Sequence, residues 1–180
     1  MAGPQVSGKP FDGHSEAHVQ GHPEKYWKLR PETPGDDEFC KCPDGPPIVL
    51  QDHLSSNPVG CVICNGEVSP ERIGFPPELA EKIASWRDLH RALFTLELDS
   101  SDYEAWARDQ LKDPGGRVNV RGLAIVEELN RYRRTYYWWF TSTEGEAVLP
   151  VANCPRCAAA LLQLAGHRVC NTCSILVPHG

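Results

Sequence analysis

The spacing of the cysteines is the feature that most constrains this chain. Eight cysteines fall into two groups of four, and three of the four close pairs have the form C-x2-C. The first group is Cys40, Cys42, Cys61 and Cys64, and the second is Cys154, Cys157, Cys170 and Cys173. A C-x2-C pair can direct two thiolates at one ion, and two facing pairs complete a tetrahedron. The sequence therefore predicts two four-cysteine metal centres.

Zinc is the metal that these ligand sets favour, so we expect two Zn²⁺ ions, with iron as the alternative because rubredoxin-like sites use similar pairs. In the second group, 12 residues separate two C-x2-C pairs, which is the pattern of a zinc ribbon. The first group joins a tighter C-x-C pair to a C-x2-C pair across 18 residues. The alternative to a four-cysteine site there is two free thiols beside a C-x2-C pair that is only half used. Catalytic zinc usually has three protein ligands and a water, so two full quartets indicate structural sites.

The first residues of the chain lack the basic start and the apolar run of a signal peptide. No apolar stretch approaches the ~20 residues that are needed to cross a bilayer. We therefore expect a cytoplasmic protein without a membrane span. In that reducing compartment, cysteines serve as metal ligands more often than as disulfides.

Composition along the 180 residues divides the chain into four segments. Residues 1–38 indicate a flexible tail, 39–75 a turn-rich zinc knuckle region, 76–134 a helical bundle, and 135–180 an aromatic strand with the C-terminal zinc ribbon. The predicted fold class is α+β, a small bundle flanked by the two metal regions. The turn-rich segments cannot build much core, so the metals would replace it.

Three helices are expected in the bundle. Pro76 and Pro77 open the first. Ser101 and Glu104 form a capping box for the second, which would stop before Gly115 and Gly116. We expect Asn119 to cap the third.

A run of aromatic residues from Thr135 to Phe140 indicates a strand, since rings suit a pleated surface. Glu144 to Glu146 then suggests the turn of a hairpin that leads into the second cysteine group. Within the ribbon, the strands of residues 161–169 should turn at Gly166.

Two features of the tail invite interpretation. A Tyr26 to Leu29 aromatic patch could dock on the folded body. His14, His18 and His22 recur every fourth residue, the spacing of a metal-binding stripe on a helix. Neighbouring glycines and a proline argue against that helix, so a solvated tail is the competing interpretation.

Charge is divided unevenly between the two parts of the chain. Residues 1–116 hold 11 Lys and Arg against 20 Asp and Glu, a net charge of −9, whereas residues 117–180 hold 7 against 4, a net charge of +3. If the ligand is nucleic acid, its phosphates should therefore contact the C-terminal half. The candidate contacts are Arg131, Arg133, Arg134, Arg156 and Arg168. The alternative for the first three is that they complement a helix C-terminus while the neighbouring rings fill the core.

From Cys61 to Pro178 the order of features resembles an uncharacterised bacterial family of Zn-ribbon-containing proteins to which nucleic-acid binding is ascribed. The residues that carry the resemblance are the pair Cys61 to Cys64, Trp86, the stretch Ser100 to Leu111, Gly122, Tyr136 with Tyr137, and the pairs Cys154 to Cys157 and Cys170 to Cys173 followed by Ser174 to Val177. Ala158 departs from the glycine that normally follows such a pair. The Cys40 and Cys42 pair has no counterpart in the family.

These observations predict a non-enzymatic zinc-binding recognition protein. Nucleic acid bound through the C-terminal half is the first candidate for its ligand. A protein partner, with the chain acting as an adaptor, is the second, and the acidic first part of the chain favours it. An enzyme with an unrecognised site is the third.

Overall fold

The computed structural model describes residues 25–29, 39–43, 45–52, 54–141 and 151–178. The helices are η1 (Trp27–Leu29), α1 (Pro70–Ile73), α2 (Pro77–Leu98), α3 (Glu104–Lys112) and α4 (Arg117–Leu129). The strands are β1 (Ile48–Leu50), β2 (Val59–Cys61), β3 (Thr135–Trp138), β4 (Leu162–Leu164), β5 (His167–Cys170) and β6 (Ile175–Val177). Helices and a mixed sheet confirm the predicted α+β class.

The six strands form one sheet in the order β2-β1-β3-β6-β5-β4. Strand β3 pairs in parallel with β1 on one side and with β6 on the other, while the remaining pairs are antiparallel. The sheet thus unites strands from segment 39–75 with strands from segment 135–180. The division into four segments stays a prediction.

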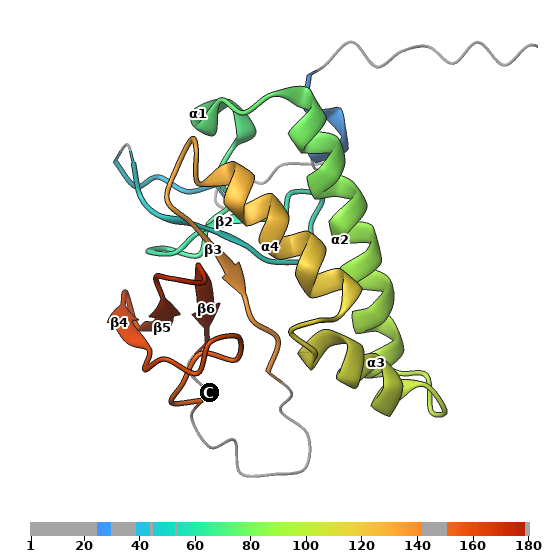
Figure 1. The fold of residues 1–180 in the computed structure, drawn as a ribbon. Coiled ribbons are helices and arrows are strands. Elements are labelled where there is room, and N and C mark those ends of the chain that lie inside the picture. The colour runs from blue at the N-terminus through green and yellow to red at the C-terminus, as the bar shows by residue number, and fades with distance from the viewer. Residues whose placement is uncertain (1–24, 30–38, 44, 53, 142–150, 179–180) are drawn as a thin grey trace, which may run out of the picture.

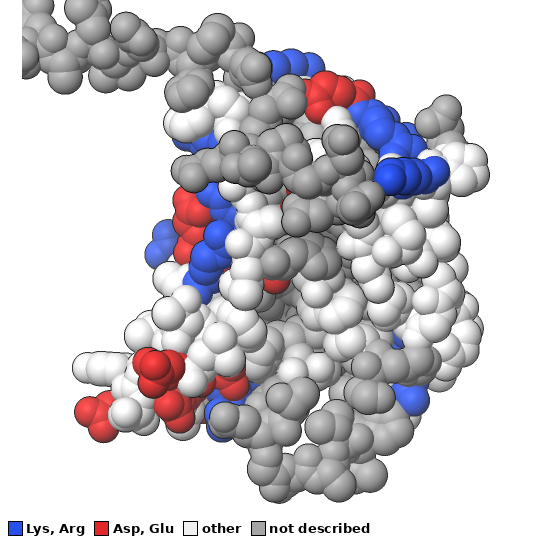
Figure 2. All heavy atoms as spheres, turned by 180° about the vertical axis from the view of Figure 1, so that it is seen from behind, with Lys and Arg blue, Asp and Glu red and all other residues white. Residues whose placement is uncertain are grey.

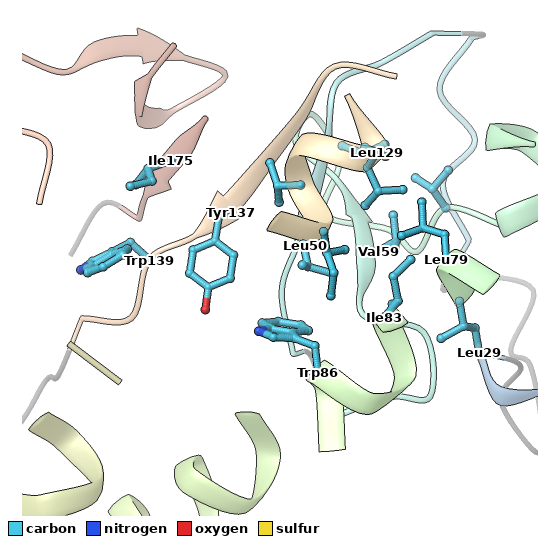
Figure 3. Close-up of a cluster of buried hydrophobic side chains, with 14 of the residues drawn as sticks. Leu29, Leu50, Val59, Leu79, Ile83, Trp86, Leu129, Tyr137, Trp139 and Ile175 are labelled. Carbon is cyan, nitrogen blue, oxygen red and sulfur yellow. The ribbon is translucent and has the colours of Figure 1, made fainter. Parts of the chain in front are cut away.

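Helices α2 and α4 cover one face of this sheet (Figure 1). Their apolar sides meet β1, β2 and β3 in the main core, where Trp86 and Ile83 of α2 lie beside Leu50 of β1 and Tyr137 of β3 (Figure 3). Burial of each such side chain contributes about 1.5–3 kcal/mol to folding. The rings of Trp86 and Tyr137 pack edge to face with centroids 5.8 Å apart.

The aromatic run forms the predicted strand, which ends at Trp138. Tyr136, Tyr137 and Trp139 are buried, so these rings fill the core, as the alternative to phosphate binding by the neighbouring arginines predicted. The ribbon strands β4 and β5 turn at Ala165 and Gly166, also as predicted.

Two predicted helix starts need correction. Helix α3 has Tyr103 as its N-cap, although the Glu104 side chain still accepts a hydrogen bond from the Ser101 backbone N–H at 3.1 Å. Helix α4 already starts at Arg117, so Asn119 does not cap it.

Asn119 instead caps the end of α3 from outside that helix. Its Nδ2 donates to the backbone oxygens of Leu111 at 2.9 Å and Asp113 at 2.8 Å. Its Oδ1 accepts a hydrogen bond of 2.8 Å from the Tyr137 hydroxyl. One buried amide therefore joins α3, α4 and β3, because the last carbonyls of a helix need donors that the helix itself cannot supply.

The N-terminal aromatic patch docks on the body as expected. Tyr26 and Leu29 are buried, and the Tyr26 hydroxyl donates to the Phe75 backbone oxygen at 2.5 Å. The His14, His18 and His22 stripe and the Glu144 to Glu146 turn lie outside the described residues. Among the described helices, none is both long enough and apolar enough to cross a membrane.

Candidate metal centres

The cysteines of each predicted group come together in space. Within each group, one Sγ from each of the four residues lies within 4.8 Å of the others. The two groups are Cys40, Cys42, Cys61 and Cys64, and Cys154, Cys157, Cys170 and Cys173. Four thiolates at such distances can surround one ion without room for a reactive water. The arrangement supports two structural metal sites, and its soft sulfur ligands suit zinc.

The first centre is built on the sheet edge at β2. Cys61 is the last residue of β2, and the chain turns back after it, with the Asn65 backbone N–H donating to the Cys61 oxygen at 2.9 Å. Asn65 has φ +60°, the left-handed conformation that suits the tight turn after the pair. Cys40 reaches the same place because its N–H donates to the Glu67 oxygen at 2.7 Å.

Arg72 of α1 fixes the unusual C-x-C pair. Its Nη1 donates to the Cys40 oxygen at 2.6 Å and its Nη2 to the Cys42 oxygen at 2.9 Å. One rigid guanidinium thereby sets the spacing of two ligand-bearing residues. The role of Arg72 was missed from the sequence, since it lies 30 positions from Cys42 along the chain and no local pattern links them.

The second centre lies at the β5 and β6 side of the sheet. Cys170 ends β5, and its Sγ accepts the Cys173 backbone N–H at 3.4 Å. The residues after its two pairs, Ala158 and Ser174, have φ +57° and +52°. The expected glycine at Ala158 is thus replaced by a residue that takes the left-handed conformation, which costs about 1 kcal/mol.

The four thiols of a cluster do not ionise equally. Hydrogen bonds from the Ala159 backbone and the Cys173 thiol lower the pKa of Cys157 to about 7. Burial and the hydrogen bond with Cys157 raise the pKa of Cys173 to about 12.

The first centre has the same asymmetry. Burial raises the pKa of Cys40, but the Cys42 backbone N–H and the neighbouring thiols lower it to about 7 overall. A hydrogen bond with Cys64 raises the pKa of Cys42 to about 12. Thiolates packed together repel one another, so a divalent cation is what would allow all four to be charged.

The five predicted phosphate contacts do not form one continuous set. Arg133 donates to the Arg72 backbone oxygen at 3.1 Å, and Arg168 donates to the Val151 oxygen at 3.0 Å. Arg134 donates to the Asn171 side chain at 2.9 Å and lies over the Tyr136 ring. Arg131 and Arg156 are exposed. Three of the five guanidinium groups thus support the fold.

One hollow does join two of these arginines. It has a volume of about 550 Å³ and lies between α4 and the second metal centre. Its lining includes Arg134, Arg156, Glu127, Asn130 and Thr172. Seen from behind relative to Figure 1, the described Lys and Arg side chains lie in separate groups with uncharged surface between them (Figure 2).

None of the protein-family models, curated proteins or solved structures that were compared with the chain matches it. The fold and the two sites therefore define the class of protein by themselves. It is an α+β chain with two four-cysteine clusters on a single mixed sheet. Its resemblance to the Zn-ribbon family stays a prediction.

Proposed function

We propose that this protein is a non-enzymatic recognition module whose two four-cysteine sites hold structural zinc ions. The observation that carries the proposal is the closure of both clusters, in which four protein thiols occupy all the positions that tetrahedral zinc offers. Zinc bound in this way stabilises the folded chain and presents its surface to a ligand. The metal itself takes no part in a reaction.

Cys157→Ser tests the structural role. Loss of one thiolate should remove zinc from the second centre and unfold the β4 to β6 region, because the binding free energy of such a site is part of its folding free energy. Proteolysis and circular dichroism would report this loss. A mutant that loses zinc but keeps its protease resistance would contradict the structural role.

Nucleic acid is the first candidate ligand, through the hollow between α4 and the second centre. Two observations support this surface, the exposed Arg156 in its lining and the net charge of +3 over residues 117–180. Arg131 is also exposed and directly follows Asn130 of the lining. The buried rings of Tyr137 and Trp139 favour contacts to phosphate over stacking on bases.

The charge-reversal pair Arg131→Glu with Arg156→Glu tests this candidate, because neither guanidinium is among the three that support the fold. Lys112→Glu with Arg117→Glu is the matched control, since it makes the same change of charge at the last residue of α3 and the first residue of α4. Binding of single-stranded RNA or DNA, followed against salt, should weaken in the first pair and lose about one unit of salt slope for each contact. Equal behaviour of both pairs, or no salt-dependent binding by the native chain, would contradict the nucleic-acid proposal.

A protein partner is the second candidate. It is favoured by four exposed apolar side chains around α3 and its neighbours, which are Leu98, Tyr103, Trp106 and Val120. Exposed aromatic residues are enriched in protein interfaces. This candidate predicts that Trp106→Ser reduces co-purification of a defined polypeptide without changing the zinc content.

A further inference from the structure

A second cavity lies at the edge of the sheet where three parallel strands end. It has a volume of about 220 Å³ and is lined by Gln51, Asp52, Trp86, His90, Phe94, Trp138, Phe140, Thr141 and Pro178. Gln51 and Asp52 directly follow β1, Phe140 and Thr141 come just after β3, and Pro178 follows β6. The carboxyl ends of parallel strands open at one edge, which is where α/β sheets commonly bind ligands.

One wall of the cavity comes from α2. Trp86, His90 and Phe94 are spaced four residues apart, so they lie on the same side of the helix. The rings of Trp86 and His90 have centroids 5.1 Å apart, and Phe94 meets Phe140 edge to face at 6.3 Å. Phe94 and Phe140 are only partly buried. Their rings therefore keep free surface at the cavity.

The polar group of the cavity is a buried carboxylate. The Asp52 side chain is 1% exposed, and its Oδ1 accepts a hydrogen bond of 2.5 Å from Arg91 Nη2. Burial raises the pKa of Asp52, but His90 and Arg91 together hold it at about 2. The cavity thus contains an ionised carboxylate at neutral pH.

The Nδ1 atom of His90 is buried and has no hydrogen-bond partner among the described residues. It lies 3.7 Å from Oδ2 of Asp52, close enough to help lower the pKa of that carboxyl but beyond the distance of a full hydrogen bond. A buried polar atom without a partner is costly, and its presence in a cavity indicates that another group completes the contact. The second carboxylate oxygen accepts a hydrogen bond of 3.3 Å from Arg91 Nε, so it is the His90 imidazole that a ligand or water can contact.

These features select among ligand charges. Ring faces carry negative electrostatic potential, and together with a carboxylate they disfavour an anion. Arg91 already balances the charge of Asp52, so a cation gains mainly from the rings, which attract a desolvated ammonium group. The volume is smaller than that of most pockets for whole metabolites, about 300–1,000 Å³. A single headgroup fits it better.

We propose that this cavity binds an alkylammonium group, either of a small free amine or of a methylated lysine side chain. The proposal goes beyond the recognition function above and does not depend on nucleic-acid binding, since the arginines of that surface do not line this cavity. None of the cavity residues was predicted as a site from the sequence.

Choline and its uncharged carbon isostere, dimethylbutanol, test the charge selection. Each would be titrated into the zinc-loaded full chain while the tryptophan indole signals are followed by NMR. We expect choline to bind about tenfold more tightly than the isostere. Equal binding of the two, or no binding of choline at tens of millimolar, would overturn the proposal.

Ring variants test the site. Phe94→Leu and Phe140→Leu keep apolar volume but remove a ring face, and each should weaken choline binding about threefold or more. Phe94→Tyr keeps the ring and should bind like the native chain, which separates loss of the ring from misfolding. Tyr132→Leu removes an exposed ring in the turn after α4, outside the cavity, and should leave choline binding unchanged. Native affinity in both leucine variants would place choline elsewhere and refute the site.

A peptide with trimethyllysine distinguishes the two sources of the group. Tighter binding of the trimethylated peptide than of choline, with the unmodified peptide as control, would assign the cavity to a protein side chain. Tighter binding of choline would assign it to a free amine. Either result requires that the ring variants lose the binding, and if they retain it the cavity is not the site.

Discussion

At the scale of single residues, Gly122 marks a close approach of α4 to β3. A Cβ atom added at Gly122 would lie 2.2 Å from Cε2 of Tyr137 and 2.8 Å from Nε1 of Trp86. Both rings are buried, and each donates a hydrogen bond that fixes its place, Trp86 to the Val118 oxygen and Tyr137 to Asn119. Only glycine allows α4 to approach the sheet this closely.

Gly122→Ala should therefore destabilise the protein. The two rings would have to move in a close-packed core, at a cost of about 1–3 kcal/mol. Gly115→Ala is the matched control, because its Cβ would meet nothing closer than 3.4 Å. Chemical denaturation of the zinc-loaded proteins measures both, and an unchanged midpoint in Gly122→Ala would contradict the packing described here.

Asp52 makes the free energy of unfolding depend on pH, with lower stability in acid. Its pKa is lowered to about 2 in the folded chain, below the ~3.9 of an unfolded aspartate. The stabilisation is therefore present above about pH 4 and is lost as the pH falls toward 2, and the shift corresponds to roughly 2 kcal/mol.

Comparison with Asp52→Asn isolates this contribution from the loss of zinc in acid, which affects both proteins. We expect the native chain to be more stable by roughly 2 kcal/mol at pH 7, with the difference narrowing below pH 4. Urea unfolding at a series of pH values measures it. A difference that is constant down to pH 2 would show that Asp52 is not held ionised as described.

At the scale of elements, the short helix α1 supports the first metal centre through Arg72. Arg72→Met keeps the apolar part of the side chain but removes both donors to the C-x-C pair. Loss of such supporting contacts typically lowers metal affinity 10–100-fold, so we expect zinc to leave the first centre at lower chelator concentration. The second centre is an internal control, and equal release from both would contradict this role.

The sequence predicts the elements better than their assembly. Helix α2 could be predicted because its apolar residues recur with the helical period, and the metal centres because thiol spacing fixes their geometry. The sheet order could not, since β1, β2 and β6 have three residues each and show no period of their own. The parallel pairing of β1 with β3 joins Ile48 to Thr135, which no local pattern encodes.

Asn119 shows why one local prediction was wrong. A short polar residue before an apolar run is typical of an N-cap, yet the same amide can serve groups far away in the chain. Here its donors face the end of α3 and its acceptor faces Tyr137. The cavity at the strand ends was missed for a related reason, because Asp52 and Phe140 become neighbours of α2 only through the sheet.

At the scale of the whole molecule, the two metal centres lie toward opposite ends of one sheet. The first includes the end of β2, which is an edge strand, and the second the end of β5. Between them, β3 joins the N-terminal pair of strands to the C-terminal three. Because the outer strands are so short, we infer that each centre stabilises its own side and that the complete sheet needs both.

Stepwise addition of zinc, after a chelator has removed the metal from the chain, tests most directly whether two zinc ions hold the fold. The Trp86 indole N–H, which donates to the Val118 oxygen inside the core, is a reporter distant from the cysteines in sequence. We predict that its native NMR signal returns in proportion to zinc and reaches full intensity at two equivalents per chain. A native spectrum before zinc is added, or one that is complete at a single equivalent, would contradict the claim that two structural zinc ions hold this fold.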